Sequence, residues 1–143
     1  MPAADDFHQA VARVEMAITE FITGNPEPLK VLWSHADDAT VFGGFDRYAR
    51  GWEQVRSNLD RASARFRGGY INFEPLAWGV SGDLAYTAGL EKGVVRLAER
   101  EGLSRLELRV THIYRREEGV WKLIHRHADA GTEKIEPTAV VQE

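Results

Sequence analysis

The sequence predicts an α+β domain in which three N-terminal helices pack on a strongly curved antiparallel sheet, giving a cone-shaped, barrel-like fold. Helical spacing of apolar residues recurs within the first 67 residues, and strand-forming stretches fill the chain from there to about residue 131. Helices followed by strands, rather than alternating with them, are typical of α+β domains. The length of 143 residues suits one domain, so we expect a single domain over 1–143, with a core over about 6–131 and a tail over 132–143.

Three segments carry the helical signals. The first runs from about Asp6 to Thr23, and a short second helix covers Pro28 to Trp33. The third runs from Trp52 to about Arg67, where Gly68 and Gly69 are expected to end it. Apolar residues recur at intervals of three and four on one face of the long helices: Phe7, Val11, Val14, Ile18 and Phe21, then Trp52, Val55, Leu59, Ala62 and Phe66.

The remaining segments are predicted strands. Pro75 cannot donate a ladder hydrogen bond, so we expect a bulge or a sheet edge there. Gly89 and Gly93 allow a long strand to bend strongly. The expected strands are Ala39–Phe42, Phe45–Arg50 (a short strand or an irregular loop), Tyr70–Val80, Leu84–Leu97, Leu103–Arg116 and Val120–Asp129, the last two joined in a hairpin around Glu118 and Gly119.

Composition excludes several classes of protein. A net charge of −4 gives no basic footprint for nucleic acid. The absence of cysteine excludes disulfides, cysteine-ligated zinc and thiol nucleophiles. No apolar stretch is long enough to span a membrane, and the first residues do not resemble a signal peptide, so we expect a cytoplasmic protein. No phosphate-binding loop or dinucleotide motif is present, so we expect no cofactor.

Three passages together resemble the SnoaL-like group of the nuclear transport factor 2-like superfamily. His35–Val41 is similar to its helix-to-strand entry, and Arg50–Val55 to the start of its third helix. Arg109–Tyr114 with Gly119–His127 is similar to its closing hairpin. The resemblance covers roughly Asp6 to Gly131 and implies a cone with a pocket at its open end. It is specific for the fold and not for an activity.

The chain departs from the ketosteroid isomerases of that superfamily at both key positions. The resemblance places their general-base aspartate where this chain has Phe42-Gly43-Gly44, and their oxyanion-binding tyrosine near Met16-Ala17-Ile18. We therefore argue against that mechanism. The hairpin also resembles small polyketide cyclases and the non-catalytic association domain of the calmodulin-dependent kinase, without separating the two.

The closing hairpin supplies the candidate catalytic residues, a histidine group of His112, His125 and His127 near Asp129. A two-residue turn at Glu118-Gly119 would place His112 opposite His125, although a slip of one residue would reverse the faces. Imidazole can act as a general acid or base near neutral pH, whereas the spacing is a weak metal signal, and we predict no metal site. Side-chain alternation predicts that one face looks into the cone: Trp121, Leu123, His125, His127 and Asp129, with Lys122, Ile124, Arg126 and Ala128 on the other.

Other residues are candidates for the pocket. Glu91, between two strand glycines, would have a raised pKa if it lay in an apolar pocket, and it could equally face solvent. Arg109 lies on the opposite strand face from His112 and is expected to be exposed or paired, but a register slip would make it a carboxylate clamp. Five aromatic residues could line the pocket, at least three of them as core: Trp33, Tyr48, Trp52, Trp78 and Tyr86.

Three functions remain open. The first is an isomerase, cyclase or hydrolase acting on a small hydrophobic carbonyl compound by His/Asp acid–base chemistry. The second is a pocket that binds a small molecule without transforming it. The third is an association module. We expect a homodimer formed through the outer face of the sheet, where Ile113 and Ile124 need cover, and no nucleic-acid or membrane partner.

Overall fold

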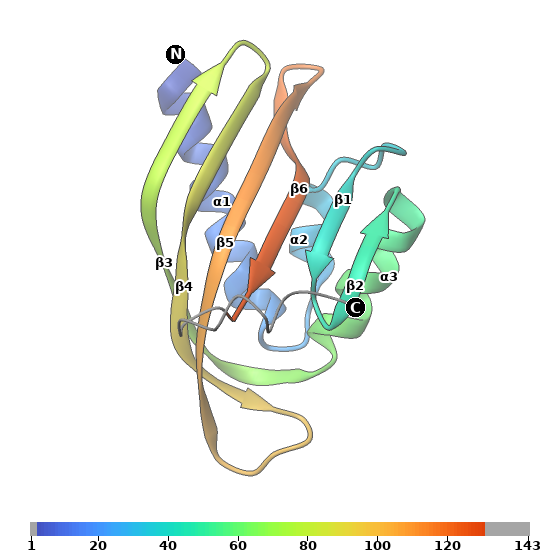
Figure 1. Ribbon diagram of the computed structural model, residues 1–143, viewed down its shortest axis with the longest axis vertical. Helices are drawn as coiled ribbons and strands as arrows, with labels where there is room; N and C mark the ends of the chain where they lie inside the picture. The colour runs from blue at the N-terminus through green and yellow to red at the C-terminus, as the bar shows by residue number, and fades with distance from the viewer. Residues whose placement is uncertain (1–2, 131–143) are drawn as a thin grey trace, which may run out of the picture.

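The computed structural model describes residues 3–130, with side chains from Asp6 onward (Figure 1). The predicted tail over 132–143 lies outside the described residues. No helix in the described range is long and apolar enough to cross a membrane. In chain order the elements are α1 (Ala3–Phe21), α2 (Glu27–Leu32), β1 (Thr40–Gly43), β2 (Asp46–Arg50), α3 (Trp52–Ser63), β3 (Phe66–Ser81), β4 (Leu84–Leu97), β5 (Leu103–Glu117) and β6 (Val120–Asp129).

The predicted α+β architecture of helices on a curved sheet is confirmed. The strands form one sheet in the order β2-β1-β6-β5-β4-β3. Neighbouring strands are antiparallel except β1 and β6, which are parallel, so the sheet is mixed rather than wholly antiparallel. In Figure 1, α1 runs along one face of the sheet, and α3 lies beside β1 and β2, at the end of the sheet that β2 forms.

The core fills the space between α1 and the inner face of the sheet. The predicted apolar stripe of α1 is buried there through Phe7, Val14 and Ile18. The ring of Phe7 meets Tyr114 edge-on, with ring centres 5.0 Å apart, and it packs similarly on Trp121. Such aromatic pairs add to the burial energy, so the end of the cone near the start of α1 is densely filled.

The third helix is shorter than the sequence pattern predicts. It ends at Ser63, where the side-chain hydroxyl donates to the carbonyl of Phe21 at 2.7 Å. Phe66 therefore begins β3 rather than continuing the helical stripe, and it pairs with Leu97. Two apolar residues spaced by four cannot distinguish a fourth helical turn from a strand that starts inside the core.

Strand β3 behaves as Pro75 predicts. It is one of the two edge strands of the sheet, and its register with β4 shifts between Pro75 and Ala77. The close approach of the two strands explains Gly93, since a Cβ there would lie 1.9 Å from the carbonyl oxygen of Tyr70. The glycine is therefore required by the backbone of the neighbouring strand.

The closing hairpin contains a bulge that changes which residues face inward. Tyr114 pairs with Leu123, but Ile113 pairs with His125, which leaves Ile124 as the extra residue. The predicted pairing of His112 with His125 is therefore wrong, and His112 pairs with Arg126. The bulge falls where β6 changes neighbour, from a bridge between Leu123 and Trp33 to ladder pairing with β1 that begins at His125.

Candidate ligand-binding cavity

A cavity of about 420 Å³ lies between the helices and the inner face of the sheet. This volume is in the range of small-molecule sites in proteins. Among its lining residues, Gly44, Phe45 and Ala130 are exposed and mark the mouth. Most of the wall is apolar and comes from every layer of the fold, through Ile18, Phe21, Ile22, Leu29, Val41, Leu59, Ala62, Phe66, Ile71, Leu106, Leu108 and Ala128.

The inner end of the cavity holds a buried ion pair. Arg126 of β6 donates two parallel hydrogen bonds to the Glu91 carboxylate of β4, each 2.8 Å long. Glu91 is 1 % exposed, yet both side chains line the cavity. The Arg126 side chain is 18 % exposed. Charges withdrawn from water to this extent are stable only as a well-bonded pair, and the bidentate geometry supplies that.

The pair decides the charge state of Glu91. Burial by itself would raise the pKa of the carboxyl, as the sequence leads one to expect for an apolar pocket. The Arg126 charge and its hydrogen bonds outweigh burial, and the pKa of Glu91 lies below its usual value. The expectation of a raised pKa is therefore wrong, because β6 delivers a guanidinium that the predicted register sends to the other face.

His112 lies behind the ion pair as a neutral ring. Its Nε2 atom is 3.0 Å from Nη1 of Arg126. A guanidinium only donates, so Nε2 accepts and the ring proton sits on Nδ1. Complete burial, reinforced by the Arg126 charge, lowers the pKa of His112 to about 3. His112 therefore orients Arg126 and is a poor base near neutral pH.

Two donors of Arg126 remain for a ligand. The guanidinium has five N–H groups, and its described contacts use two on Nη1 and one on Nη2. Within residues 3–130 the Nε–H and the second Nη2–H have no hydrogen-bond partner. An acceptor atom brought into the cavity would meet unused donors in an apolar setting, where a hydrogen bond is stronger than in water.

A small void lies beside the ion pair. It measures about 10 Å³, roughly the space for one water molecule, and Glu91 and His112 form part of its wall. The Thr87 and Tyr114 hydroxyls also line it, and neither has a hydrogen-bond partner in the described structure. Glu15 closes the void from α1, and burial, followed by the charge of Glu91, raises the pKa of its carboxyl.

A second polar group lies nearer the mouth. Asn58 of α3 is 1 % exposed and lines the cavity. Its Nδ2 donates to the carbonyl of Gly43 and to Oδ2 of Asp46, each at 3.1 Å. Arg61 also bonds Asp46, and this bond, opposed by burial and supported by Asn58, holds the pKa of Asp46 below its usual value.

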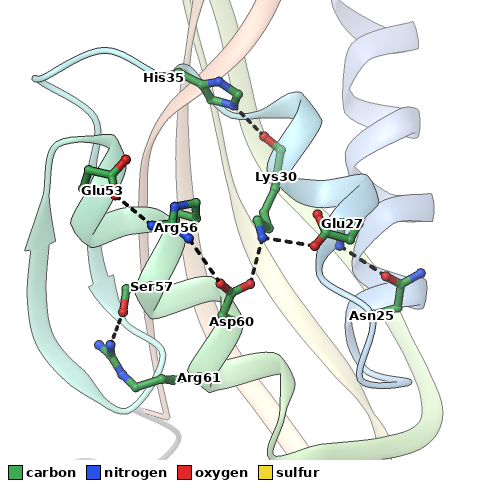
Figure 2. Close-up of polar contacts among 9 residues, drawn as sticks. All are labelled: Asn25, Glu27, Lys30, His35, Glu53, Arg56, Ser57, Asp60 and Arg61. Atoms are coloured by element: carbon green, nitrogen blue, oxygen red, sulfur yellow. Dashed lines mark hydrogen bonds and ion pairs between the residues drawn. The ribbon is translucent and has the colours of Figure 1, made fainter.

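Ion pairs fix the helix that carries Asn58 (Figure 2). Lys30 of α2 donates to Asp60 of α3 at 2.9 Å and to Glu27 at 3.2 Å. Arg56 lies between Glu53, at 2.7 Å, and Asp60, at 4.0 Å. Partly exposed pairs contribute little stability one by one, but this network links α2 to α3 along the outer side of the cavity wall.

The predicted histidine group does not form inside the cone. Beyond the bulge, Arg126 and Ala128 line the cavity, and His125 and His127 do not. His125 instead bonds Thr40 through Nδ1 at 2.8 Å. None of the chain's histidines, all within the described residues, lines the cavity. Asp129 is at its mouth and pairs with Arg109 at 2.7 Å.

Arg109 remains on the outer face of the sheet. The register changes in β6 rather than in β5, so the alternative of Arg109 as a clamp inside the cone is wrong. It forms part of a shallow hollow of about 340 Å³ with Thr111, His127 and Asp129. The hollow is open and lined by polar groups, which makes it a weaker candidate site than the apolar cavity.

None of the five aromatic candidates lines the cavity. Trp33 is buried in the core, and Trp52 packs against that core with His35 stacked on it at 3.8 Å. Trp78 contacts Phe7 and His8 at the start of α1 and is half exposed. Two of the five thus pack on the core, where at least three were expected, while Tyr48 is 61 % and Tyr86 42 % exposed.

Arg126 and Asn58 were not predicted to line the cavity, and each has a signal in the sequence. The adjacent apolar pair Leu123-Ile124 interrupts strand alternation, which is the pattern of a bulge, and accepting it turns Arg126 inward. Asn58 follows Val55 by three residues and precedes Ala62 by four, so it lies on the apolar face of its helix. A polar residue there needs a partner.

Acidic and imidazole side chains form no metal-binding cluster in the described part of the chain. No group of three His, Asp or Glu side chains gathers there in a way that could hold an ion. The polar groups that line the cavity are one hydrogen-bonded ion pair with spare donors, one amide and two carboxylates near the mouth.

The family model described as a SnoaL-like domain matches residues 5–130. No curated protein matches the chain. Among solved structures, a nuclear transport factor 2-like superfamily protein from Salmonella enterica serovar Typhimurium superposes with a TM-score of 0.78 at 14 % identity, covering 93 % of this chain and 94 % of that one. At this low sequence identity, the structural similarity establishes the fold.

Two further structures are similar. A hexachlorocyclohexane dehydrochlorinase from Novosphingobium barchaimii gives a TM-score of 0.69 at 18 % identity, covering 94 % of this chain and 95 % of that one. A protein of unknown function with a cystatin-like fold from Nostoc punctiforme gives 0.66 at 23 % identity, covering 90 % and 92 %.

Proposed function

Because the chain belongs to the SnoaL-like domain family, we propose that its cavity binds a small, largely apolar molecule whose carbonyl oxygen accepts hydrogen bonds from Arg126. The observation that carries this is the apolar cavity of about 420 Å³ with two unused Arg126 donors at its inner end. A neutral carbonyl is favoured over a carboxylate, because Glu91 already balances the Arg126 charge and an added anion would be buried without a counterion.

The test uses two compounds that differ only in the carbonyl. Tetralin and 1-tetralone are two-ring molecules small enough for the cavity, and binding to the folded state raises the unfolding temperature. We expect 1-tetralone to bind more tightly than tetralin. Arg126→Met should remove this preference, whereas Arg109→Met on the outer face should keep it.

A second pair of variants locates the ligand. Ala128→Leu places extra carbons in the cavity and should abolish binding of both compounds, whereas Ala88→Leu on β4, outside the cavity lining, should not. Binding that survives Ala128→Leu but is lost in Arg109→Met would move the ligand to the outer hollow and overturn the proposal.

Acid–base catalysis is the second candidate, and Glu91 is the observation in its favour. Its ionised carboxylate lines the same cavity as Arg126, so it could take a proton from the carbon next to a bound carbonyl while Arg126 stabilises the enolate oxygen. One protein of similar fold is an enzyme, the hexachlorocyclohexane dehydrochlorinase. The lowered pKa makes Glu91 a weak base, so we rank this function below simple binding.

Deuterium exchange separates the two functions. Glu91 would remove a C2 hydrogen of 1-tetralone, exchange it with D2O and return deuterium to the same carbon. NMR of 1-tetralone should then show exchange faster than in buffer, lost in Glu91→Gln. Exchange at the buffer rate in the presence of a bound ligand would leave binding as the function.

A homodimer through the outer sheet face is also proposed. Phe42 and Tyr86 are each 42 % exposed there, and Ile113 is partly exposed beside them. Light scattering during gel filtration should give twice the chain mass, and Ile113→Lys should give the monomer. A wild-type monomer at micromolar concentration would contradict the dimer.

A further inference from the structure

We propose that the cavity selects ligands carrying a hydroxyl group on the mouth side of the carbonyl, and that the amide oxygen of Asn58 accepts the hydrogen bond of this hydroxyl. The inference rests on the proposed function, because it adds a second polar contact to the ligand held at Arg126. It narrows the ligand class from apolar carbonyl compounds to hydroxy-carbonyl compounds.

The orientation of the Asn58 amide is set by its neighbours. Its Nδ2 atom lies 3.1 Å from two oxygens, the Gly43 carbonyl and Oδ2 of Asp46, and both can only accept. Rotating the amide would set its oxygen against both of them, so the NH2 group must face them. Both N–H donors are thereby used, and Oδ1 is left as an acceptor.

Oδ1 has no hydrogen-bond donor among the described residues. Asn58 is 1 % exposed and borders the cavity. An amide oxygen that borders an apolar cavity and has no donor is the acceptor that a ligand hydroxyl would bond. Gly44 leaves the room for this arrangement, since a Cβ there would come within 2.8 Å of Oδ1.

The position of Asn58 sets where the hydroxyl lies. A Cβ on Gly43 would be 2.6 Å from the carbonyl oxygen of Ala128, so Gly43 and its partner Asn58 sit at the level of Ala128. Ala128 is two residues beyond Arg126 on the same strand face, about 7 Å closer to the mouth. The ligand therefore spans from an acceptor at Arg126 to a donor at Asn58, with an apolar body between them.

The charge at this level favours a neutral hydroxyl. Asp46 is ionised, because Arg61 and Asn58 hold it in that state against the effect of burial. An anionic group on the ligand would meet that negative charge, whereas a hydroxyl donates to an oxygen. Asp46 thus acts as a positioning residue for the Asn58 amide.

The experiment compares 6-hydroxy-1-tetralone with 6-methyl-1-tetralone by isothermal titration, below the pKa of the phenol. Methyl and hydroxyl are close in size, and a purely apolar wall would favour methyl. A site built to bond a hydroxyl rejects the analogue that lacks it. We expect wild-type protein to prefer the hydroxy compound by about tenfold or more.

Variants assign the preference. Asn58→Ala should reduce it to within about threefold of unity. Asn72→Ala, at an exposed position on β3, is the matched control and should retain the full preference. Asp46→Asn keeps Asn58 but weakens its orientation, and should give an intermediate preference.

The outcomes separate this inference from the proposed function. Equal or weaker binding of the hydroxy compound by the wild type, with 1-tetralone still bound, overturns the hydroxyl contact alone. No binding of any tetralone overturns the proposed function. If Asn58→Ala does not fold, the wild-type comparison and Asp46→Asn still decide. A preference unchanged in Asn58→Ala would place the hydroxyl elsewhere and refute the assignment.

Discussion

The buried pair between Glu91 and Arg126 gives the sharpest energetic prediction. Removing one partner of a buried ion pair leaves an uncompensated charge and typically costs about 3–5 kcal/mol. Glu91 has almost no exposed surface, so Arg126→Met should fall at the upper end of this range. Arg126 keeps its contact with His112 and reaches the cavity, so Glu91→Leu should cost about 3 kcal/mol.

The double variant distinguishes the pair from two independent residues. Glu91→Leu with Arg126→Met replaces both charges by apolar groups, and such replacements are often close to neutral. We expect it to be more stable than either single variant, with a coupling energy of at least about 2 kcal/mol.

Urea unfolding of the four proteins at neutral pH measures the cycle, using the midpoint and a common slope. Additive losses, with coupling below about 0.5 kcal/mol, would refute the claim that the two side chains form one buried unit. If a single variant is too unstable to measure, Glu91→Gln gives the same comparison with a smaller loss, since the amide still offers one acceptor.

Three further predictions concern the surroundings of the pair. The pKa of His112 is about 3 in the folded protein and 6.5 when unfolded, so the unfolded state binds more protons between these pH values. The free energy of unfolding should therefore fall by about 1.4 kcal/mol per pH unit below 6.5. His112→Gln should remove this part of the slope in urea titrations between pH 6.5 and 5. Thr87→Val should leave the free energy of unfolding, measured in urea, unchanged or raise it by up to about 1 kcal/mol, because the hydroxyl has no described partner. A clear loss of stability would show that the void holds a bonded water. Gly93→Ala should lower the free energy of unfolding by about 1–3 kcal/mol, measured by thermal unfolding. Gly79→Ala should lower it less, because the added methyl meets only the movable Tyr86 ring. Equal losses in the two variants would contradict the steric explanation.

The fold could be predicted because its signals are local and repeated. The spacing of apolar residues predicted α1, and the turn residues predicted the bounds of β4 and β6 that the structure shows. Pro75 identified an irregular edge strand because a missing amide donor has the same consequence in any sheet. The end of α3 was harder to predict, since Phe66 fits the apolar stripe of a helix and a buried position in a strand equally well.

The site was harder to predict because it depends on one extra residue in β6. Strand alternation is cumulative, so the bulge at Ile124 exchanges the faces of every later side chain. That single event moves Arg126 into the cavity and keeps His127 outside it. Glu91 lies in the cavity wall, but its ionised state depends on Arg126, which the assumed register had turned away.

The most direct test of the account is an NMR titration of isotope-labelled protein with 1-tetralone, following the Arg126 Nε–H signal and the backbone amides. The account predicts that this signal shifts together with the amides of cavity residues such as Ala62, Leu108 and Ala128. An unchanged Arg126 signal, with shifts confined to Thr111 and His127 on the outer face, would contradict it.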